Sequence, residues 1–363
     1  MKQAYRRWVC GLLGGGLLIL MACGAIVYAV DPCLYYRMPQ GRAPVFFNAR
    51  WQAAGIAKNV EADTVLLGTS MAANYRGSEI GEVFGGTAVR ITVPDGRYRE
   101  FDAVVETLFR HRSPERVIFA LDLNTLVRDE SQTADVMPMY LYNASRLDDA
   151  RYLLNKDTLS YSFYALISQR WGGGETLDES FVWETGIWWN HMTALEGYDR
   201  PAQSTVTADP QEVCRRAAEN LAVMSRWFRE HPDTQFEVFL SPYSMLFWDK
   251  SARLGQTEAM LAALELACEE LTGYDNVRLH GCLMDREIVD DLDYYCDHLH
   301  HSREACQRVL EKIAAEEVLL TKENVAETLA NWRRFVVNYD YEKFWDESFW
   351  VAWNAAKADR SDG

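Results

Sequence analysis

Three residues far apart in the chain have the side chains needed for nucleophilic catalysis. Ser70 follows an apolar segment in the run Gly68, Thr69, Ser70, and Asp297 and His300 lie near the other end of the sequence. A serine hydroxyl becomes a good nucleophile when a base removes its proton, and a third group must orient that base. Ser70, His300 and Asp297 could supply nucleophile, base and carboxylate. The pattern predicts acyl transfer through a covalent serine intermediate.

The spacing of Asp297 and His300 supports this interpretation. Three residues apart at the predicted start of a helix, they should lie on one side of its first turn. The carboxylate can then hold one imidazole nitrogen while the other faces Ser70. His298 and His301 compete for the role of base, and with Asp297 they could be read as metal ligands. The sequence has no second ligand cluster, so we expect neither a metal nor another cofactor.

A tetrahedral intermediate also needs donors for its oxyanion. The backbone amide of Ser70 is the first candidate, because a serine that follows a strand directs this group to the edge of the sheet where ligands bind. Gly96 and Asn124, each after a predicted strand, are the other candidates, and a glycine lets the backbone approach a ligand closely. Taken singly, a helix-capping Ser70 and turn residues at Gly96 and Asn124 are the simpler interpretations.

Short apolar runs alternate with segments of helical period over most of the chain. Buried strands are predicted at 63–67, 88–93, 116–121, 236–240 and 277–279. Helices are predicted at 99–111, 211–230, 257–271 and 303–320. This alternation predicts an α/β fold with a mainly parallel sheet covered on both faces, which places Ser70 at the carboxyl edge.

The chain begins with an apolar run at residues 8–30, preceded by basic residues and long enough to cross a bilayer. The positive-inside rule leaves residues before it in the cytoplasm and puts those after Asp31 outside. A cleaved signal peptide ending near Ala29 and a lipoprotein signal at Cys23 are the alternatives. Because the run is long and continues past Cys23, we expect residues 1–30 to form an uncleaved single-pass anchor.

Two regions are rich in aromatic residues, one inside the predicted extracytoplasmic domain at 31–330 and one after it. Residues 131–210 interrupt the alternation and include Trp171, Trp183, Trp188 and Trp189. We interpret this region as an insertion beside the site, serving as a substrate-binding lid or a membrane-facing platform, with an aromatic minicore as the alternative. The tail at 331–363 mixes aromatic with acidic residues, which favours packing on the main domain over membrane binding, with disorder at its end.

Charge and cysteine content narrow the function classes. A net charge of −16 argues against nucleic acid as a partner and against electrostatic docking on anionic lipid, because both are bound through Lys and Arg. Disulfides between Cys296 and Cys306 or between Cys268 and Cys282 are compatible with an exposed location, and buried free thiols are an equal alternative. A phosphodiesterase or nuclease has no support, since neither a carboxylate cluster nor a basic groove is evident.

The chain resembles the SGNH or GDSL hydrolase-like superfamily over about residues 50–310, and within it the membrane-anchored extracytoplasmic bacterial proteins related to teichoic acid D-alanylation and polysaccharide O-acetylation. The resemblance lies in Gly-Ile-Ala-Lys-Asn at 55–59, Val-Leu-Leu-Gly-Thr-Ser-Met at 65–71, Ser-Pro-Tyr-Ser at 241–244 with Trp248, and Tyr-Tyr-Cys-Asp-His-Leu-His-His-Ser at 294–302. It implies a flavodoxin-like α/β/α fold in which Ser70 is the nucleophile, His300 the base and Asp297 its partner.

The match departs from the superfamily at three places. Thr69 stands where many members have an acidic residue, the glycine block survives only as Gly96, and the asparagine block only loosely as Asn124. The oxyanion residues are therefore less clearly indicated than the triad.

These observations predict a membrane-anchored extracytoplasmic serine esterase or O-acyltransferase. Its expected substrates are a cell-envelope glycopolymer or an acylated small molecule, and a membrane-embedded partner could deliver the acyl group. The alternative is a noncatalytic envelope protein of the same fold that binds a glycan or a membrane partner through its aromatic insertion.

Overall fold

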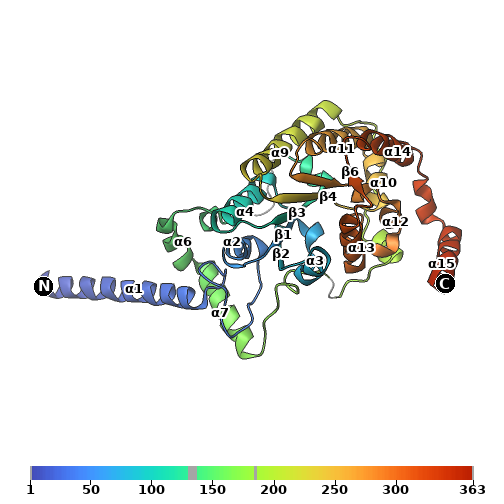
Figure 1. The fold of residues 1–363 in the computed structure, drawn as a ribbon. Helices are drawn as coiled ribbons and strands as arrows, with labels where there is room; N and C mark the ends of the chain where they lie inside the picture. The colour runs from blue at the N-terminus through green and yellow to red at the C-terminus, as the bar shows by residue number, and fades with distance from the viewer. Residues whose placement is uncertain (1, 130–136, 184–185, 362–363) are drawn as a thin grey trace.

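A six-stranded sheet lies at the centre of the computed structural model, which describes residues 2–129, 137–183 and 186–361 (Figure 1). The strands in the described residues are β1 (Thr64–Gly68), β2 (Ala88–Thr92), β3 (Arg116–Leu121), β4 (Gln235–Leu240), β5 (Val277–His280) and β6 (Leu319–Leu320). Their order is β2-β1-β3-β4-β5-β6, and every pairing is parallel except that of β5 with β6. The first five strands follow the flavodoxin-like order. The predicted α/β class and mainly parallel sheet are confirmed.

Helices cover both faces of this sheet (Figure 1). One layer contains α2 (Ala49–Asn59), α4 (Tyr98–His111), α9 (Pro210–Glu230) and α11 (Thr257–Leu271), and the other contains α3 (Gly77–Phe84) and α13 (Arg303–Ala314). In α4, Phe101, Val104, Val105 and Leu108 are buried, at the spacing of one helical face. Because both faces are covered, the strands are nearly continuous apolar runs.

The last helix-to-strand connection differs from the prediction of one helix over 303–320. Helix α13 ends at Ala314, and Glu316 takes a left-handed backbone conformation with φ of 60°. Leu319 and Leu320 then pair antiparallel with β5. The prediction was wrong here because the apolar residues at 318–320 fit a helical period but find their burial at the edge of the sheet.

Helix α1 (Lys2–Val30) projects from the domain and is long and apolar enough to span a membrane (Figure 1). Its last turns pack on the domain: Val27 is buried, and Gly24 lies against Leu153 and Leu154. The guanidinium of Arg37 donates to the carbonyls at the end of the helix, where a cation is favourable.

The region predicted as an insertion connects α5 (Leu123–Leu126) to α9. Its described part contains η2 (Met139–Leu141), η3 (Arg146–Asp148), α6 (Asp149–Leu153), α7 (Lys156–Arg170) and α8 (His191–Glu196). Helices α6 and α7 pack against α1. Farther along, the buried guanidinium of Arg90 in β2 donates to the carbonyls of Ala73, Tyr75 and Ser180, which ties the insertion to the sheet.

The C-terminal tail packs on the main domain. It consists of α14 (Val325–Val337), η6 (Tyr341–Trp345) and α15 (Glu347–Ser361). Trp332 and Phe344 are buried, and the Trp332 ring lies 5.9 Å from that of Trp248 in α10 (Met245–Arg253). Disorder was expected for the last few residues, but α15 continues to Ser361, and residues 362–363 lie outside the described residues.

All eight cysteines lie in the described residues and are free thiols. Neither of the two cysteine pairs considered from the sequence is bonded.

Candidate active site

Ser70 stands where β1 passes into the short helical turn η1 (Ser70–Ala72). The Thr69 hydroxyl accepts the amide of Met71, at 3.2 Å, and so caps this turn. Gly68 permits the tight connection, because a Cβ there would lie 2.6 Å from the Ala72 Cβ and 2.9 Å from the Ala120 Cβ. Ser70 is therefore held at the carboxyl edge of the sheet, with its amide at the amino-terminal end of the turn.

His300 bridges Ser70 and Asp297. Its Nε2 lies 2.9 Å from the Ser70 Oγ, and its Nδ1 lies 2.7 Å from Asp297 Oδ2. The second carboxylate oxygen of Asp297 accepts the backbone amides of Leu299 and His300, each at 2.7 Å. These contacts join the three residues that the sequence analysis singled out, in the order nucleophile, base and carboxylate.

The Asp297–His300 segment is a loop, whereas the sequence analysis placed it at the start of a helix. A bridge between Tyr295 and His301 closes this loop, and Ser302 caps α13, which begins at Arg303. The prediction of helical spacing was wrong. Asp297 and His300 face each other because the aspartate caps its own turn through backbone amides, a frequent role of Asp in turns.

The surroundings of Asp297 keep it ionised. Burial raises the pKa of this carboxyl group, but the hydrogen bond and charge of His300 and the two backbone amides outweigh burial and bring the pKa down to about 2. An ionised Asp297 accepts from Nδ1 of His300. Nε2 is then the nitrogen that can take the proton of the Ser70 hydroxyl.

The two neighbouring histidines do not contact Ser70. Burial and the charge of Lys250 lower the pKa of His298 to about 4, and its Nε2 lies 3.2 Å from the Lys250 ammonium. His301 is buried between the rings of Tyr75 and Tyr295, and burial lowers its pKa to about 3. Both are neutral at neutral pH, and His300 is the histidine that contacts Ser70.

A buried carboxyl group that the sequence analysis did not recognise lies next to the triad. Asp122, at the end of β3, accepts a hydrogen bond from the Thr69 hydroxyl. Burial raises the pKa of Asp122 to about 6, against the opposing effects of Ser241, Thr69 and His300. The only sequence signal was its position one residue after a predicted strand, beside the strand that leads to Ser70.

The three candidate oxyanion donors are in different situations. The Ser70 amide is at the first position of its turn, where an amide has no partner within the helix. The Gly96 amide donates to the Val93 carbonyl at 2.8 Å in a tight turn, so it is engaged already. Asn124 follows Asp122 closely and is half-buried, and no group among the described residues hydrogen-bonds its carboxamide. Ser70 and Asn124 remain candidates in this conformation, whereas Gly96 has a structural role.

Trp183 from the insertion covers the imidazole of His300. The two rings are stacked, with centroids 4.2 Å apart. The carboxamide of buried Asn74 accepts the Trp183 amide at 3.0 Å and donates to the His301 carbonyl at 2.9 Å, which clamps the insertion to the histidine loop. Trp183 was named from the sequence only as one of several tryptophans in the insertion, and Asn74 gave no recognisable signal.

This arrangement can activate a hydroxyl for attack on an electrophilic carbonyl. The base His300 is oriented, and its partner Asp297 is ionised. The backbone amide of Ser70, at the start of a helical turn, is available to an oxyanion. Within the part of the chain that the structure describes, no group of three or more His, Cys, Asp or Glu side chains is arranged to hold a metal ion.

Comparisons with known proteins add little to this geometry. No family model and no curated protein matches the chain. A solved structure from Streptococcus pneumonia, described as "a putative platelet activating factor", is similar with a TM-score of 0.38 and 13% identity, over 74% of this chain and 91% of that one. At this level of similarity, nothing about the present chain follows from it.

Proposed function

We propose that this protein is a serine esterase or O-acyltransferase of the SGNH type, with Ser70, His300 and Asp297 as its catalytic residues. The observation that carries the proposal is the unbroken chain of contacts from the Ser70 hydroxyl through both nitrogens of His300 to Asp297. Residues more than 200 positions apart in the sequence meet there in the order that nucleophilic catalysis requires.

In the proposed reaction, His300 takes the proton of the Ser70 hydroxyl as its oxygen attacks the carbonyl carbon of an acyl ester. The resulting oxyanion is held by the Ser70 amide and the Asn124 carboxamide. His300 then gives the proton to the leaving alcohol, and the acyl group stays on Ser70. A second hydroxyl, from water or from an acceptor sugar, repeats the sequence in reverse and releases the acyl group.

The proposed location and substrate class rest on α1 and on the aromatic insertion. A single helix of this length and composition at the N-terminus favours a membrane anchor that keeps the domain outside the cytoplasm. A hydroxyl-rich cell-envelope glycopolymer is the proposed acyl acceptor or ester substrate. Trp183 beside the base offers a ring on which a sugar can stack.

Labelling of the full-length protein in neutral detergent with a fluorophosphonate probe tests the proposal. The probe reacts with activated serines, so wild type should be labelled, while Ser70→Ala should lose labelling and His300→Ala should lose nearly all of it. Ser78→Ala is the matched control, since Ser78 is an exposed serine only a few residues away. Equal labelling of wild type and Ser70→Ala, with all variants folded, would contradict the proposal.

The second candidate function is a noncatalytic glycan- or partner-binding protein of the envelope. Two exposed tryptophans of the insertion, Trp171 and Trp188, favour it, because exposed aromatic rings are common at binding surfaces. If alanine at Ser70, Asp297 and His300 left envelope acylation unchanged while removal of residues 171–190 abolished function, this second candidate would replace the first.

A further inference from the structure

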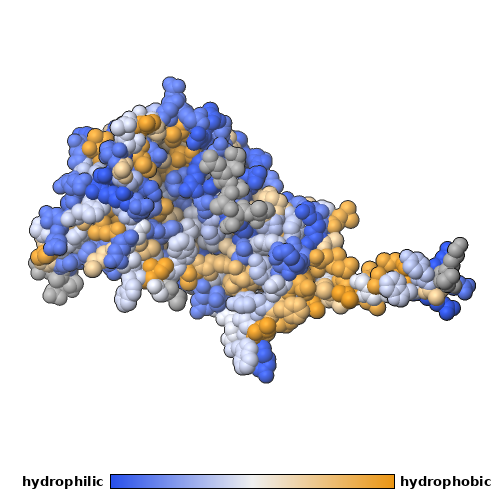
Figure 2. Space-filling model, turned by 180° about the vertical axis from the view of Figure 1, so that it is seen from behind, coloured by the Kyte–Doolittle hydropathy of each residue, from blue (hydrophilic) through white to orange (hydrophobic). Residues whose placement is uncertain are grey.

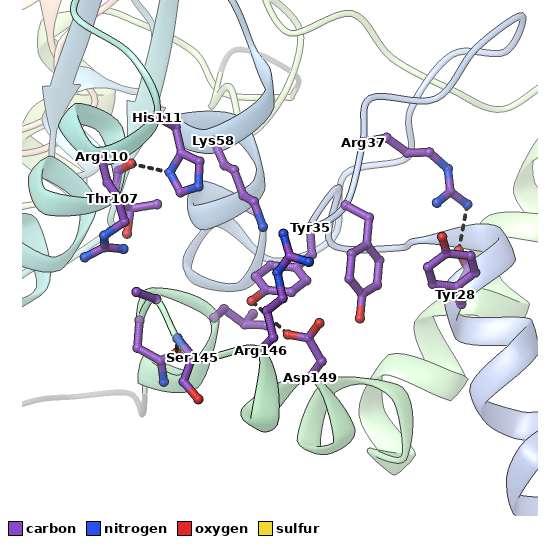
Figure 3. Close-up of a pocket in the computed structure, with 14 residues that line it drawn as sticks. Tyr28, Tyr35, Arg37, Lys58, Thr107, Arg110, His111, Ser145, Arg146 and Asp149 are labelled. Atoms are coloured by element: carbon purple, nitrogen blue, oxygen red, sulfur yellow. Dashed lines mark hydrogen bonds between the residues drawn. The ribbon is translucent and has the colours of Figure 1, made fainter.

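A polar cavity of about 680 Å³ opens beside the base of α1 (Figure 3), and Ser70 is not among its lining residues. Lys58 lies at the end of α2, which leads into β1, and His111 lies at the end of α4, which leads into β3. These ends adjoin the amino edge of the sheet, whereas Ser70 follows the carboxyl end of β1. Tyr28 of α1 also lines the cavity. The cavity is a separate site of ligand size that adjoins the predicted anchor.

The lining of the cavity is cationic, in a chain whose net charge is −16. Arg37, Lys58, Arg110 and Arg146 line it, and Asp149 is the one acidic residue among the lining residues. The cavity is therefore locally positive, although the chain as a whole is negative. Clustered cations of this kind attract anions, and a ligand with a negatively charged phosphate group matches them.

Lys58 and Arg146 are the cations best placed to meet such a ligand. Figure 3 shows both side chains directed into the space above Tyr35 and Asp149. The Lys58 ammonium lies 4.2 Å from the centre of the Tyr35 ring, and neither cation forms an ion pair within the described residues. Burial lowers the pKa of Lys58, the charge of Asp149 opposes this, and nearby Arg146 lowers the pKa further. A bound anion would relieve the repulsion between the two cations.

Helix α7 packs against α1 and α6, which both contribute residues to the cavity. Its small or polar residues Thr158, Ser162 and Ala165 are buried, whereas Phe163, Tyr164 and Ile167 are 49–60% exposed. This is the reverse of the pattern in a water-facing helix, since the apolar face points outward. Helix α7 packs against α1, and hydrophobic residues continue from α1 onto α7 in Figure 2. A lipid bilayer around α1 is the surface that would cover this face.

We propose that the cavity binds the phosphate-bearing headgroup of an anionic membrane lipid, while the apolar face of α7 rests in the adjoining bilayer surface. Arg146 and Lys58 contact the phosphate, and Tyr28 and Tyr35 border it at the depth where aromatic rings meet the headgroups. Binding holds the domain in one orientation on the membrane. The proposal requires that α1 spans a membrane, and it is independent of any reaction at Ser70.

The test measures lipid binding to the full-length protein carrying Ser70→Ala, so that no bound lipid can be turned over at Ser70. The protein in neutral detergent is titrated with short-chain phosphatidylglycerol, with the zwitterionic phosphatidylcholine of the same chain length, and with inorganic phosphate. The cavity variant is Lys58→Gln with Arg146→Gln. Its matched control is Arg229→Gln with Lys322→Gln, which removes the same charge outside the cavity.

We expect phosphatidylglycerol to bind at least about tenfold more tightly than phosphatidylcholine, and the cavity variant to lose at least about tenfold in affinity while the control stays within about twofold. Arg146 is exposed, so Arg146→Gln alone should fold even if the double variant does not, and it should lose part of the affinity. Unchanged affinity in a folded cavity variant would overturn the proposal. So would displacement of the lipid by an equal concentration of inorganic phosphate, which would show a site for free phosphate.

Discussion

The two edges of the sheet hold polar groups in opposite states. At the carboxyl edge, both ring nitrogens of His300 and both carboxylate oxygens of Asp297 have hydrogen-bond partners within the chain. At the amino edge, Lys58 and Arg146 face a cavity in which Asp149 is the single acidic lining residue. The candidate catalytic side chains are thus fixed by hydrogen bonds within the protein. The two cations of the cavity form no ion pair among the described residues, which leaves them free to pair with a charged ligand.

The cavity also bears on the prediction drawn from total charge. The net charge of −16 argued against docking on anionic lipid. A total charge does not show how the charge is distributed, and attraction between charges falls off over about 8–10 Å in physiological salt. A local cluster of cations can therefore bind an anion on a protein that repels it elsewhere.

The largest expected effect on the labelling rate is at the carboxyl edge of the sheet. Asp297→Asn should lower the rate of fluorophosphonate labelling by about 10²- to 10⁴-fold, because a carboxamide neither fixes the tautomer of His300 nor stabilises its charged form. The measurement is the labelling rate under excess probe, with exposed Asp275→Asn as the control. A loss below about threefold would break the assignment of Asp297 as the partner of the base.

Removal of the ring above His300 should have a smaller effect. Trp183→Ala deletes a stacked contact worth about 1 kcal/mol, so the labelling rate should fall about five- to tenfold. Trp171→Ala, in the same insertion but 83% exposed, should leave the rate unchanged in detergent. Equal labelling rates for the two variants would show that the ring of Trp183 has no specific effect on His300.

The buried carboxyl group of Asp122 should affect stability with a definite pH dependence. Its pKa is raised to about 6 from 3.8, so the unfolded state loses this proton at lower pH than the folded state does, and stability falls as the pH rises from about 4 to about 6. Asp122→Asn removes this penalty, which amounts to about 3 kcal/mol above pH 6. Thermal unfolding of the full-length protein should show the variant stabilised at pH 8 and little changed near pH 4. A variant destabilised at pH 8 would contradict the assignment of Asp122 as a carboxyl group whose ionised form is disfavoured by burial.

The smallest expected effect is that of the cavity variant on the reactivity of Ser70. Lys58→Gln with Arg146→Gln should leave the labelling rate of Ser70 within about twofold of wild type in detergent, because additivity is expected for separate sites without shared partners. A larger change would show that the cavity and the triad are coupled.

Much of the fold could be predicted from short local patterns. Apolar runs bounded by polar residues located β1 to β5, since a strand buried on both faces is apolar over most of its length. The same logic missed β6, whose two residues become a strand only through pairing with Leu279 and His280. The choice of His300 over His298 and His301 followed from its spacing to Asp297, although the helix assumed for that spacing is a loop.

The amino-acid sequence alone therefore determined where β1 to β5 lie along the chain, the apolar N-terminal helix and the candidate triad. Each of these depends on local periodicity or on the chemistry of single side chains. Only the tertiary structure decided that the Gly96 amide is engaged, that Asp122 lies buried beside the site, that Trp183 covers His300, and that the scattered cations converge on one cavity. These features depend on distances between residues far apart in the chain, which side-chain packing sets and no local pattern encodes.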